Sequence, residues 1–201
     1  MRITEIRPRR KSLSAVYIDG EFAMTLDSRT LLENRFVAGR EIDDDELREI
    51  IRLSNENRAK EKALWLISYR SHSKKELTDK IRRTCDSEAA EKAADRMEEL
   101  GLINDRDYAV RLTEHLLFGK HMSKRAAFFE LTRKGIDRET AEEILEETEY
   151  DPREQIEIFL SKKYKDLSDE KTRRRAFAAL QRLGHGSDDI RAVLSLLEEE
   201  Y

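Results

Sequence analysis

The stretch SKKELTDKIRR, residues 73–83, decides the fold, because two similar stretches follow it at an almost constant spacing. They are SKRAAFFELTRK at 123–134 and KTRRRAFAALQR at 171–182. Their apolar positions Ile81, Leu131 and Leu180 are 50 and 49 residues apart. A fixed period of this length is typical of tandem repeats, in which each unit buries its apolar face against its neighbours.

Each repeat has the pattern of three helices, and the stretch above is the middle one. Residues that cap helix N-termini precede the apolar runs at Ser73, Ser87, Ser123, Asp137, Asp151, Ser168 or Asp169, and Ser187. We therefore expect a mainly α-helical protein in which three tandem three-helix repeats form an elongated array. The expected modules are an N-terminal β-hairpin and helix at 1–55 and repeats at 56–104, 105–149 and 150–201.

The N-terminal module is predicted from LSAVYIDGEFAMTL, residues 13–26. Asp-Gly between alternating hydrophobic residues favours a type I′ hairpin turn, whose two central residues need positive φ. A two-residue turn at Asp19-Gly20 pairs Tyr17 with Phe22, Ala15 with Met24 and Leu13 with Leu26. The apolar residues Ile3 and Ile6 are compatible with a further strand.

A long helical pattern opens in the acidic run Asp43–Glu46, where carboxylates suit the first helical turn. It becomes polar through Asn55–Lys62, which predicts either a bridging helix or a hinge. The first helix of repeat 1 follows, with Ala63, Leu64 and Ile67 expected inward. Trp65 lies beside this stripe, and we expect it to be half-buried.

The composition excludes several classes of protein. Of the 201 residues, 41% are charged and 38% hydrophobic, with 2 Pro and 7 Gly, which suits long exposed helices. The single cysteine, Cys85, argues against a disulfide framework and a four-ligand zinc site and favours a reducing cytoplasm. No apolar run approaches the ~20 residues of a membrane span, and no signal peptide is recognisable.

The charge is sorted by helix. The middle helices at 73–83, 123–134 and 171–182 carry net +3, +3 and +5. The third helices at 87–100, 137–149 and 187–200 carry −3, −6 and −4. In a stacked array the middle helices would form a positive ribbon that attracts phosphates, and the third helices a negative one that suits a basic protein surface. The alternative is that these are ordinary solvated helix faces.

No catalytic constellation is recognisable. The histidines His72, His115, His121 and His185 lack helical metal-site spacing, and Cys85 has no histidine partner. We therefore expect no enzyme activity, metal or cofactor. His72 and His185 lie in turns beside basic helices, where they could contact phosphate. The helical spacing of Phe128, Phe129 and Phe177 favours core packing over base stacking.

Three motifs in order carry a resemblance to a known family. They are ISYRSHSKKELTDKI at 67–81, LGLINDRDYAVRL at 100–112 and SKRAAFFELTRKGID at 123–137. The matching residues are Arg70, Ser73-Glu76-Leu77, Gly101-Leu102-Ile103-Asn104-Asp105, Tyr108-Ala109 and Leu131-Lys134-Gly135-Ile136. From about residue 59 onward the sequence resembles the RecX regulatory proteins of bacteria. Two departures are Cys85, where the other repeats have glycine, and Gly184-His185-Gly186.

The resemblance implies three tandem three-helix units and a non-enzymatic regulator. RecX proteins bind the RecA recombinase, above all its filaments on single-stranded DNA, and inhibit or remodel them. They thereby modulate recombination, DNA repair and the SOS coprotease activity. The partners implied are the RecA filament, its single strand and, more weakly, duplex DNA, with no membrane and a monomeric regulator. The candidate binding residues follow from the charge of the middle helices and not from the resemblance: they are Lys74, Lys75, Arg82, Lys124, Arg125, Lys134, Arg173, Arg174 and Arg175, with Arg70 preceding them.

Two alternatives remain open from the residues themselves. A middle and a third helix together could form a helix-turn-helix that binds DNA or RNA directly. The chain could also be a scaffold for protein partners whose charge is incidental.

Overall fold

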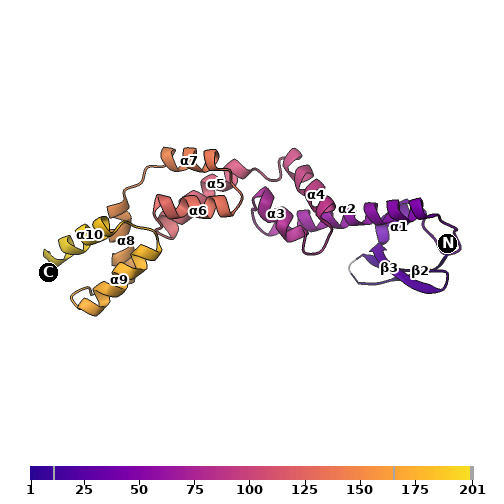
Figure 1. Ribbon diagram of the computed structural model, residues 1–201, viewed down its shortest axis with the longest axis horizontal. Helices are drawn as coiled ribbons and strands as arrows, with labels where there is room; N and C mark the ends of the chain where they lie inside the picture. The colour runs from indigo at the N-terminus through magenta and orange to yellow at the C-terminus, as the bar shows by residue number, and fades with distance from the viewer. Residues whose placement is uncertain (11, 165, 200–201) are drawn as a thin grey trace. The chain divides into compact units, whose positions relative to one another are not determined.

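The computed structural model describes residues 1–10, 12–164 and 166–199, so Glu200, counted above with the third acidic helix, lies outside it. The chain separates into two compact units, Met1–Ile103 and Asn104–Tyr201 (Figure 1). The fold is mainly helical with a small N-terminal antiparallel sheet, which confirms the predicted class. The finer division into four modules stays a prediction.

The first unit contains three strands and four helices in the described residues. They are β1 (Ile3–Pro8), β2 (Leu13–Ile18), β3 (Glu21–Asp27), α1 (Ser28–Glu33), α2 (Asp44–Tyr69), α3 (Lys74–Ile81) and α4 (Ser87–Glu99). The sheet order is β1-β2-β3, so the expected hairpin is extended by the strand suggested by the N-terminal isoleucines.

The turn of the hairpin is the predicted one, but the register is not. Asp19 and Gly20 both have positive φ, at 52° and 91°, and Tyr17 pairs with Phe22. A bulge then shifts the register, so that Val16 pairs with Met24. The predicted pairs beyond the turn, Ala15 with Met24 and Leu13 with Leu26, are therefore wrong by one residue, as expected when a strand accommodates an extra residue.

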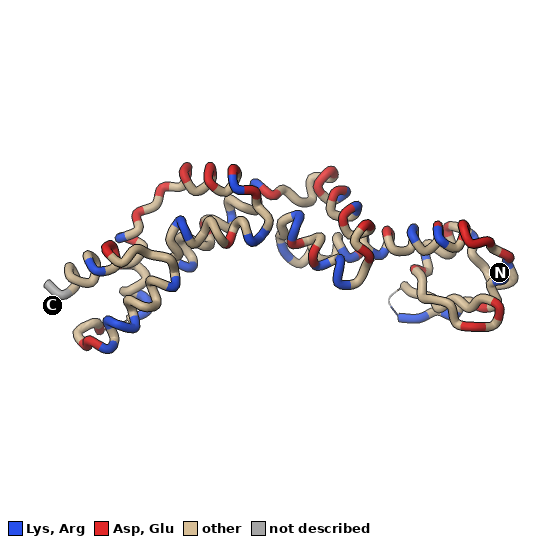
Figure 2. Tube along the Cα trace, in the orientation of Figure 1, with Lys and Arg blue, Asp and Glu red and all other residues tan. Residues whose placement is uncertain are grey.

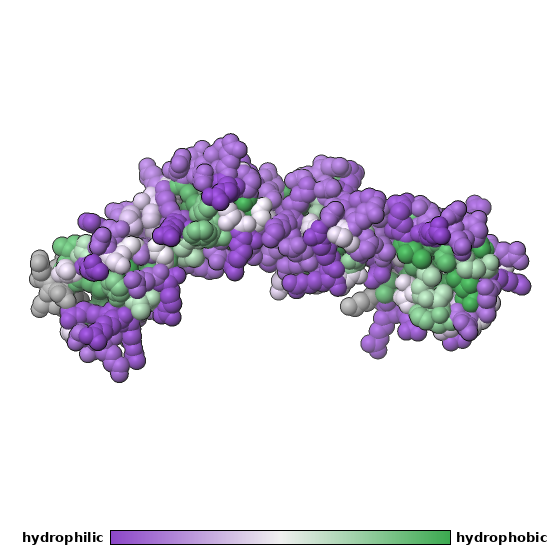
Figure 3. All heavy atoms as spheres, viewed as in Figure 1, coloured by the Kyte–Doolittle hydropathy of each residue, from purple (hydrophilic) through white to green (hydrophobic). Residues whose placement is uncertain are grey.

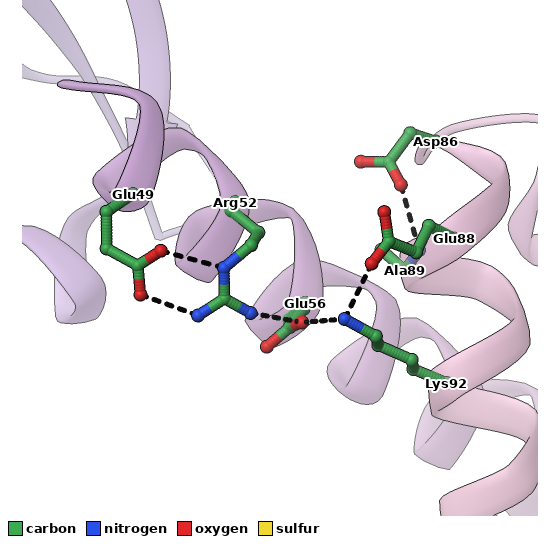
Figure 4. Close-up of polar contacts among 7 residues, drawn as sticks. All are labelled: Glu49, Arg52, Glu56, Asp86, Glu88, Ala89 and Lys92. Carbon is green, nitrogen blue, oxygen red and sulfur yellow. Dashed lines mark hydrogen bonds and ion pairs between the residues drawn. The ribbon is translucent and has the colours of Figure 1, made fainter. Parts of the chain in front are cut away.

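Helix α2 begins with a complete capping box, in which Asp43 and Glu46 each bond the backbone of the other. It then runs unbroken for 26 residues, so the polar stretch at 55–62 is a bridging helix and not a hinge. Charged partners along one face support it, as Figure 4 shows. Arg52 pairs with Glu49 and Glu56 at 2.6 Å each, and Lys92 of α4 reaches Glu56 at 3.1 Å.

The polar residues of α2 also fasten the N-terminal module. The buried Ser54 accepts a hydrogen bond from the backbone N–H of Asp27 at 2.8 Å. Asn57 donates to the Thr30 hydroxyl, also at 2.8 Å. Polarity in this part of the helix therefore serves an intramolecular contact, which explains why the sequence pattern there resembles a linker.

Repeat 1 is built by the second half of α2 with α3 and α4. Its buried core is formed mainly by alanines of α2 and α4 together with Leu77, Ile81 and Met97. Ser73 caps α3 as predicted, whereas α4 is capped by Asp86 and not by Ser87. Leu64, which was expected inward, is 50% exposed, and so is Leu100 at the end of α4.

The second unit contains two further three-helix sets. Its elements are α5 (Asp105–Glu114), the π-helical turn η1 (His115–Gly119), α6 (Lys124–Arg133), α7 (Arg138–Glu147), α8 (Pro152–Lys163), α9 (Glu170–Arg182) and α10 (Ser187–Glu199). The predicted caps Ser123, Asp137, Asp151 and Asp169 all accept hydrogen bonds from the first turns of their helices. Each set surrounds its own apolar core.

Some apolar side chains stay at the surface. On the N-terminal module, where Figure 3 shows apolar side chains gathered on the visible face, Phe22, Leu32 and Val37 are more than half exposed. Trp65, expected to be half-buried, is 59% exposed. Among the helices that the structure describes, none is both long and apolar enough to cross a bilayer.

Candidate interface for nucleic acid and a protein partner

Nine of the ten candidate cations lie on the middle helices or at their C-caps. Arg70 follows α2, α3 and its C-cap hold three of them, α6 and its C-cap hold three, and α9 holds the arginine triplet. Figure 2 shows the basic residues along α6 and α9 and the acidic ones along α7. What distinguishes the candidates is how far carboxylates neutralise them.

In repeat 1 the candidate cations are paired with carboxylates. Arg70 donates two hydrogen bonds to the Glu76 carboxylate, the shorter one at 2.7 Å. Lys74 lies between two acids of α4, at 2.8 Å from Asp95 and 2.7 Å from Glu98, and these hydrogen bonds raise its pKa well above the usual range. The acidic third helix thus lies against the basic middle helix.

The other two candidates of this repeat follow the same pattern. Arg82 pairs with Glu91 of α4 at 2.5 Å and more loosely with Asp79. Lys75 lies 3.8 Å from Asp79 one turn along its own helix. Exposed pairs of this kind stabilise a protein little, but they lower the charge available to a phosphate. The two charged surfaces predicted for this repeat therefore partly cancel each other.

Three candidate cations of the second unit, Lys124, Arg125 and Arg175, are more available. Arg125 and Arg175 are exposed, and neither forms an ion pair with any residue that the structure describes. Lys124 donates to the Thr148 carbonyl at 2.7 Å, which leaves its charge uncompensated. Lys134 is the C-cap of α6.

The arginine triplet of α9 is not uniform. Arg174 pairs with Glu170 one turn earlier at 2.5 Å, whereas Arg175 stays unpaired in the described part of the unit. Arg173 is half-buried and lines an apolar pocket of about 650 Å³ formed mainly by residues of α8 and α10 and the segment between α8 and α9. Of the three, Arg175 has the most exposed uncompensated charge.

A tight joint brings the start of α6 to the end of α9. The backbone N–H of Ser123 donates to the Leu183 carbonyl at 2.9 Å, and His185 Nε2 donates to the His121 carbonyl at 2.8 Å. Next to this joint lies a shallow pocket of about 300 Å³, lined by Arg125, Ala126, Phe129, Gln181, Gly184 and His185. The joint therefore places the start of the basic helix α6 next to the end of the basic helix α9.

Two of the histidines are too buried to contact a phosphate. His72 and His185 are only 3% and 5% exposed, so the predicted phosphate contacts are wrong. Each donates one ring N–H to a carbonyl while its second ring nitrogen, buried, has no partner among the described residues. Burial lowers the pKa of both imidazoles, which keeps them neutral.

The aromatic residues divide between core and surface. Phe128 and Phe177 pack against the cores of their repeats, as expected, but Phe129 is 60% exposed. The sequence interpretation also missed Tyr69, which is 82% exposed and stacks with Trp65. Their i, i+4 spacing on a helix was the available signal, since such residues share a face.

Metal chemistry has no recognisable place in the described ranges. Among these residues, no three His, Cys, Asp or Glu side chains are grouped to hold a metal ion. The described surface offers charged, aromatic and hydrogen-bonding groups, which suit recognition of partners.

Comparison with known proteins agrees with this architecture. The family model for the first three-helix domain of RecX matches residues 59–97. A crystal structure of regulatory protein RecX superposes with a TM-score of 0.59 at 18% identity, covering 96% of this chain and 98% of that one. RecX from Lactobacillus salivarius gives 0.53 at 22% identity over 72% of this chain and 97% of its own. These two structures show the shared fold.

Sequence relatives cover most of the chain. The regulatory protein RecX of Bacillus subtilis (strain 168) is 29% identical over 206 residues, 98% of this chain and 78% of that protein. That of Caldanaerobacter subterraneus subsp. tengcongensis is 30% identical over 160 residues, 79% of this chain and 80% of its own. With the motifs, repeats and fold in agreement over this length, the chain belongs to the family of RecX regulatory proteins.

Proposed function

We propose that this protein binds the RecA recombinase and its filaments on single-stranded DNA, and that it inhibits or remodels them without catalysing a reaction of its own. It would thereby modulate recombination, DNA repair and the SOS coprotease activity in the cytoplasm. The observation that supports the proposal is the joint between α6 and α9, which places two basic middle helices end to start within one unit, with the acidic helix α7 packed on α6.

The two kinds of charge match what a filament offers. Uncompensated cations such as Arg125 and Arg175 can approach phosphates and release their counterions. Helix α7 begins at Arg138, but five of its ten residues are glutamates, which suits a basic patch on a protein. A nucleoprotein filament presents both phosphates and a protein surface, whereas naked DNA or a protein alone presents only one of the two.

The test is the ATP hydrolysis rate of preformed RecA filaments on circular single-stranded DNA, titrated with this protein. We expect the rate to fall at amounts well below one per RecA monomer. The double variant Arg125→Ala/Arg175→Ala should inhibit less, whereas Arg191→Ala, on α10, removes one exposed arginine and should inhibit normally.

If the hydrolysis rate is unchanged at excess protein, the proposal that this protein inhibits RecA filaments is wrong. Sequence-selective binding to naked duplex DNA would then favour the alternative of a helix-turn-helix protein that binds nucleic acid directly. Partner binding that is insensitive to salt would instead favour the scaffold.

A further inference from the structure

Two aromatic rings stand exposed on the last turns of α2. Trp65 is 59% exposed and Tyr69 is 82% exposed. The rings are nearly parallel, at 13°, with centroids 6.5 Å apart. This separation is near the long end of the range for interacting aromatic pairs. Single exposed apolar residues are ordinary, but two aligned rings on one helix face form a surface that a further flat ring can cover.

The same face of α2 is basic. Residues i−3 and i−7 from Trp65 share its face, and these are Lys62 and Arg58. Lys62 Nζ lies over the Trp65 ring, 4.2 Å from its centroid. Arg58 donates to the Thr84 carbonyl at 3.2 Å, which leaves its charge intact. In the described residues neither cation is paired with a carboxylate.

The local charge balance agrees. Residues 58–70 contain four basic side chains and one acidic one, Glu61. The pKa of the Arg29 guanidinium of α1 is raised mainly by its hydrogen bond to Glu33, and the charge of Glu61 adds a small part to this rise. The acidic helix α4 packs on the other side of α2, where its alanines meet Ala59 and Ala63. The aromatic face is therefore positive, although repeat 1 as a whole is nearly neutralised.

We propose that Trp65 and Tyr69 form a stacking platform for a base of single-stranded nucleic acid, with Lys62 and Arg58 facing the flanking phosphates. Parallel aromatic rings with adjacent cations are what binding of a single strand requires, since every base has a π-face and every nucleotide a phosphate. A duplex keeps its bases stacked on each other and cannot cover the rings. The platform deepens the proposed function by giving the strand a place on the first unit.

The only tryptophan of the chain is part of the platform, so its fluorescence reports on it directly. Oligothymidylate titrated into the protein should quench this emission to saturation. An abasic oligonucleotide of the same length carries the same phosphates without bases, and it should bind more weakly and leave the emission nearly unchanged. Equal quenching by both oligonucleotides would overturn the proposal, because charge alone would then explain the binding.

Variants test the rings by anisotropy of a labelled oligothymidylate. Trp65→Leu and Tyr69→Ala should each weaken binding about tenfold, as expected for the loss of one stacked base. Phe22→Leu removes a comparably exposed ring, 54% exposed, from the N-terminal sheet and should bind like the wild type. Urea unfolding of each variant verifies that it is folded.

The outcome is separable from that of the filament assay, because the titration contains no recombinase. If the Trp65→Leu variant binds the strand normally but no longer inhibits filaments, the platform proposal is wrong. The rings would then be a contact for a protein partner. Specific quenching by oligothymidylate without any filament inhibition would uphold the platform and refute the proposed function.

Discussion

Gly184 lies so close to Ser123 that a methyl group on its Cα would come within 2.5 Å of the Ser123 hydroxyl oxygen. The same methyl would approach Ala126 Cβ to 2.6 Å. Gly184 also has a φ of +89°, in the left-handed region that side chains disfavour. Close approach and backbone conformation thus both require glycine where α9 ends against the start of α6.

Gly184→Ala should destabilise the second unit by several kcal/mol. The left-handed conformation costs an alanine about 1–2 kcal/mol, and the steric clash adds about 1–3 kcal/mol typical of overpacking. Urea unfolding followed by circular dichroism measures the loss. Gly101→Ala is the matched control, because Gly101 has a φ of +67° but open space around the added methyl. Equal losses at both glycines would show that the contact with Ser123 is unimportant.

Local chemistry made much of this fold predictable. The caps at Ser73, Ser123, Asp137 and Asp151 depend on side-chain bonds to residues two or three positions onward, which a sequence displays directly. The turn at Asp19-Gly20 is equally local. Apolar periodicity then located the helices between these signals.

Errors arose where distant residues decide. Trp65 was expected to be half-buried because it adjoins an apolar stripe, but the contact of α2 with α4 is formed by alanines and Trp65 is 59% exposed. His185 is buried because α9 ends against His121, 64 residues away in sequence. The pairing of Lys74 with Asp95 and Glu98 likewise depends on packing of α3 against α4, so the net charge of a helix overstated its free charge.

Acidification should destabilise the protein through its buried histidines. The pKa of His185 is lowered in the folded protein, chiefly by burial, and the hydrogen bond to the His121 backbone and the Asp189 carboxylate only partly oppose this. The unfolded chain therefore takes up protons first, and stability present above pH ~6.5 is lost as the pH falls toward the folded pKa. The loss amounts to about 1.4 kcal/mol per unit by which the two pKa values differ.

Urea unfolding at pH 7.5 and 5.5 measures this loss. His185→Gln should narrow the difference, because an amide can still donate to the His121 carbonyl but does not titrate. His115→Gln serves as control, since His115 is exposed. If the two variants keep the same pH dependence, buried His185 is not its source.

Ser54→Ala should loosen the N-terminal module from α2. The substitution leaves the buried N–H of Asp27 without an acceptor, and an unsatisfied buried donor costs about 1–3 kcal/mol. Hydrogen exchange of the Asp27 amide, followed by NMR, should accelerate. Ser68→Ala, an exposed serine whose hydroxyl bonds the Trp65 carbonyl on its own helix, should leave that exchange unchanged. Slow exchange in the Ser54 variant would mean that another group takes over the bond.

Salt dependence should separate the paired arginines from the unpaired ones. Each phosphate contact on a single strand contributes about 0.7 to the slope of log affinity against log salt. Arg125→Ala and Arg175→Ala should each lower the slope by about that amount, because both side chains are exposed and unpaired within the described residues. Arg174→Ala should lower it less, since Glu170 already lies 2.5 Å from its guanidinium, and Arg191→Ala on the acidic α10 should not lower it at all.

Anisotropy titrations between about 50 and 200 mM salt measure these slopes. If substitution of all of Arg173–Arg175 leaves both the slope and filament binding unchanged, the basic surface of α9 is a solvated face and does not bind the strand.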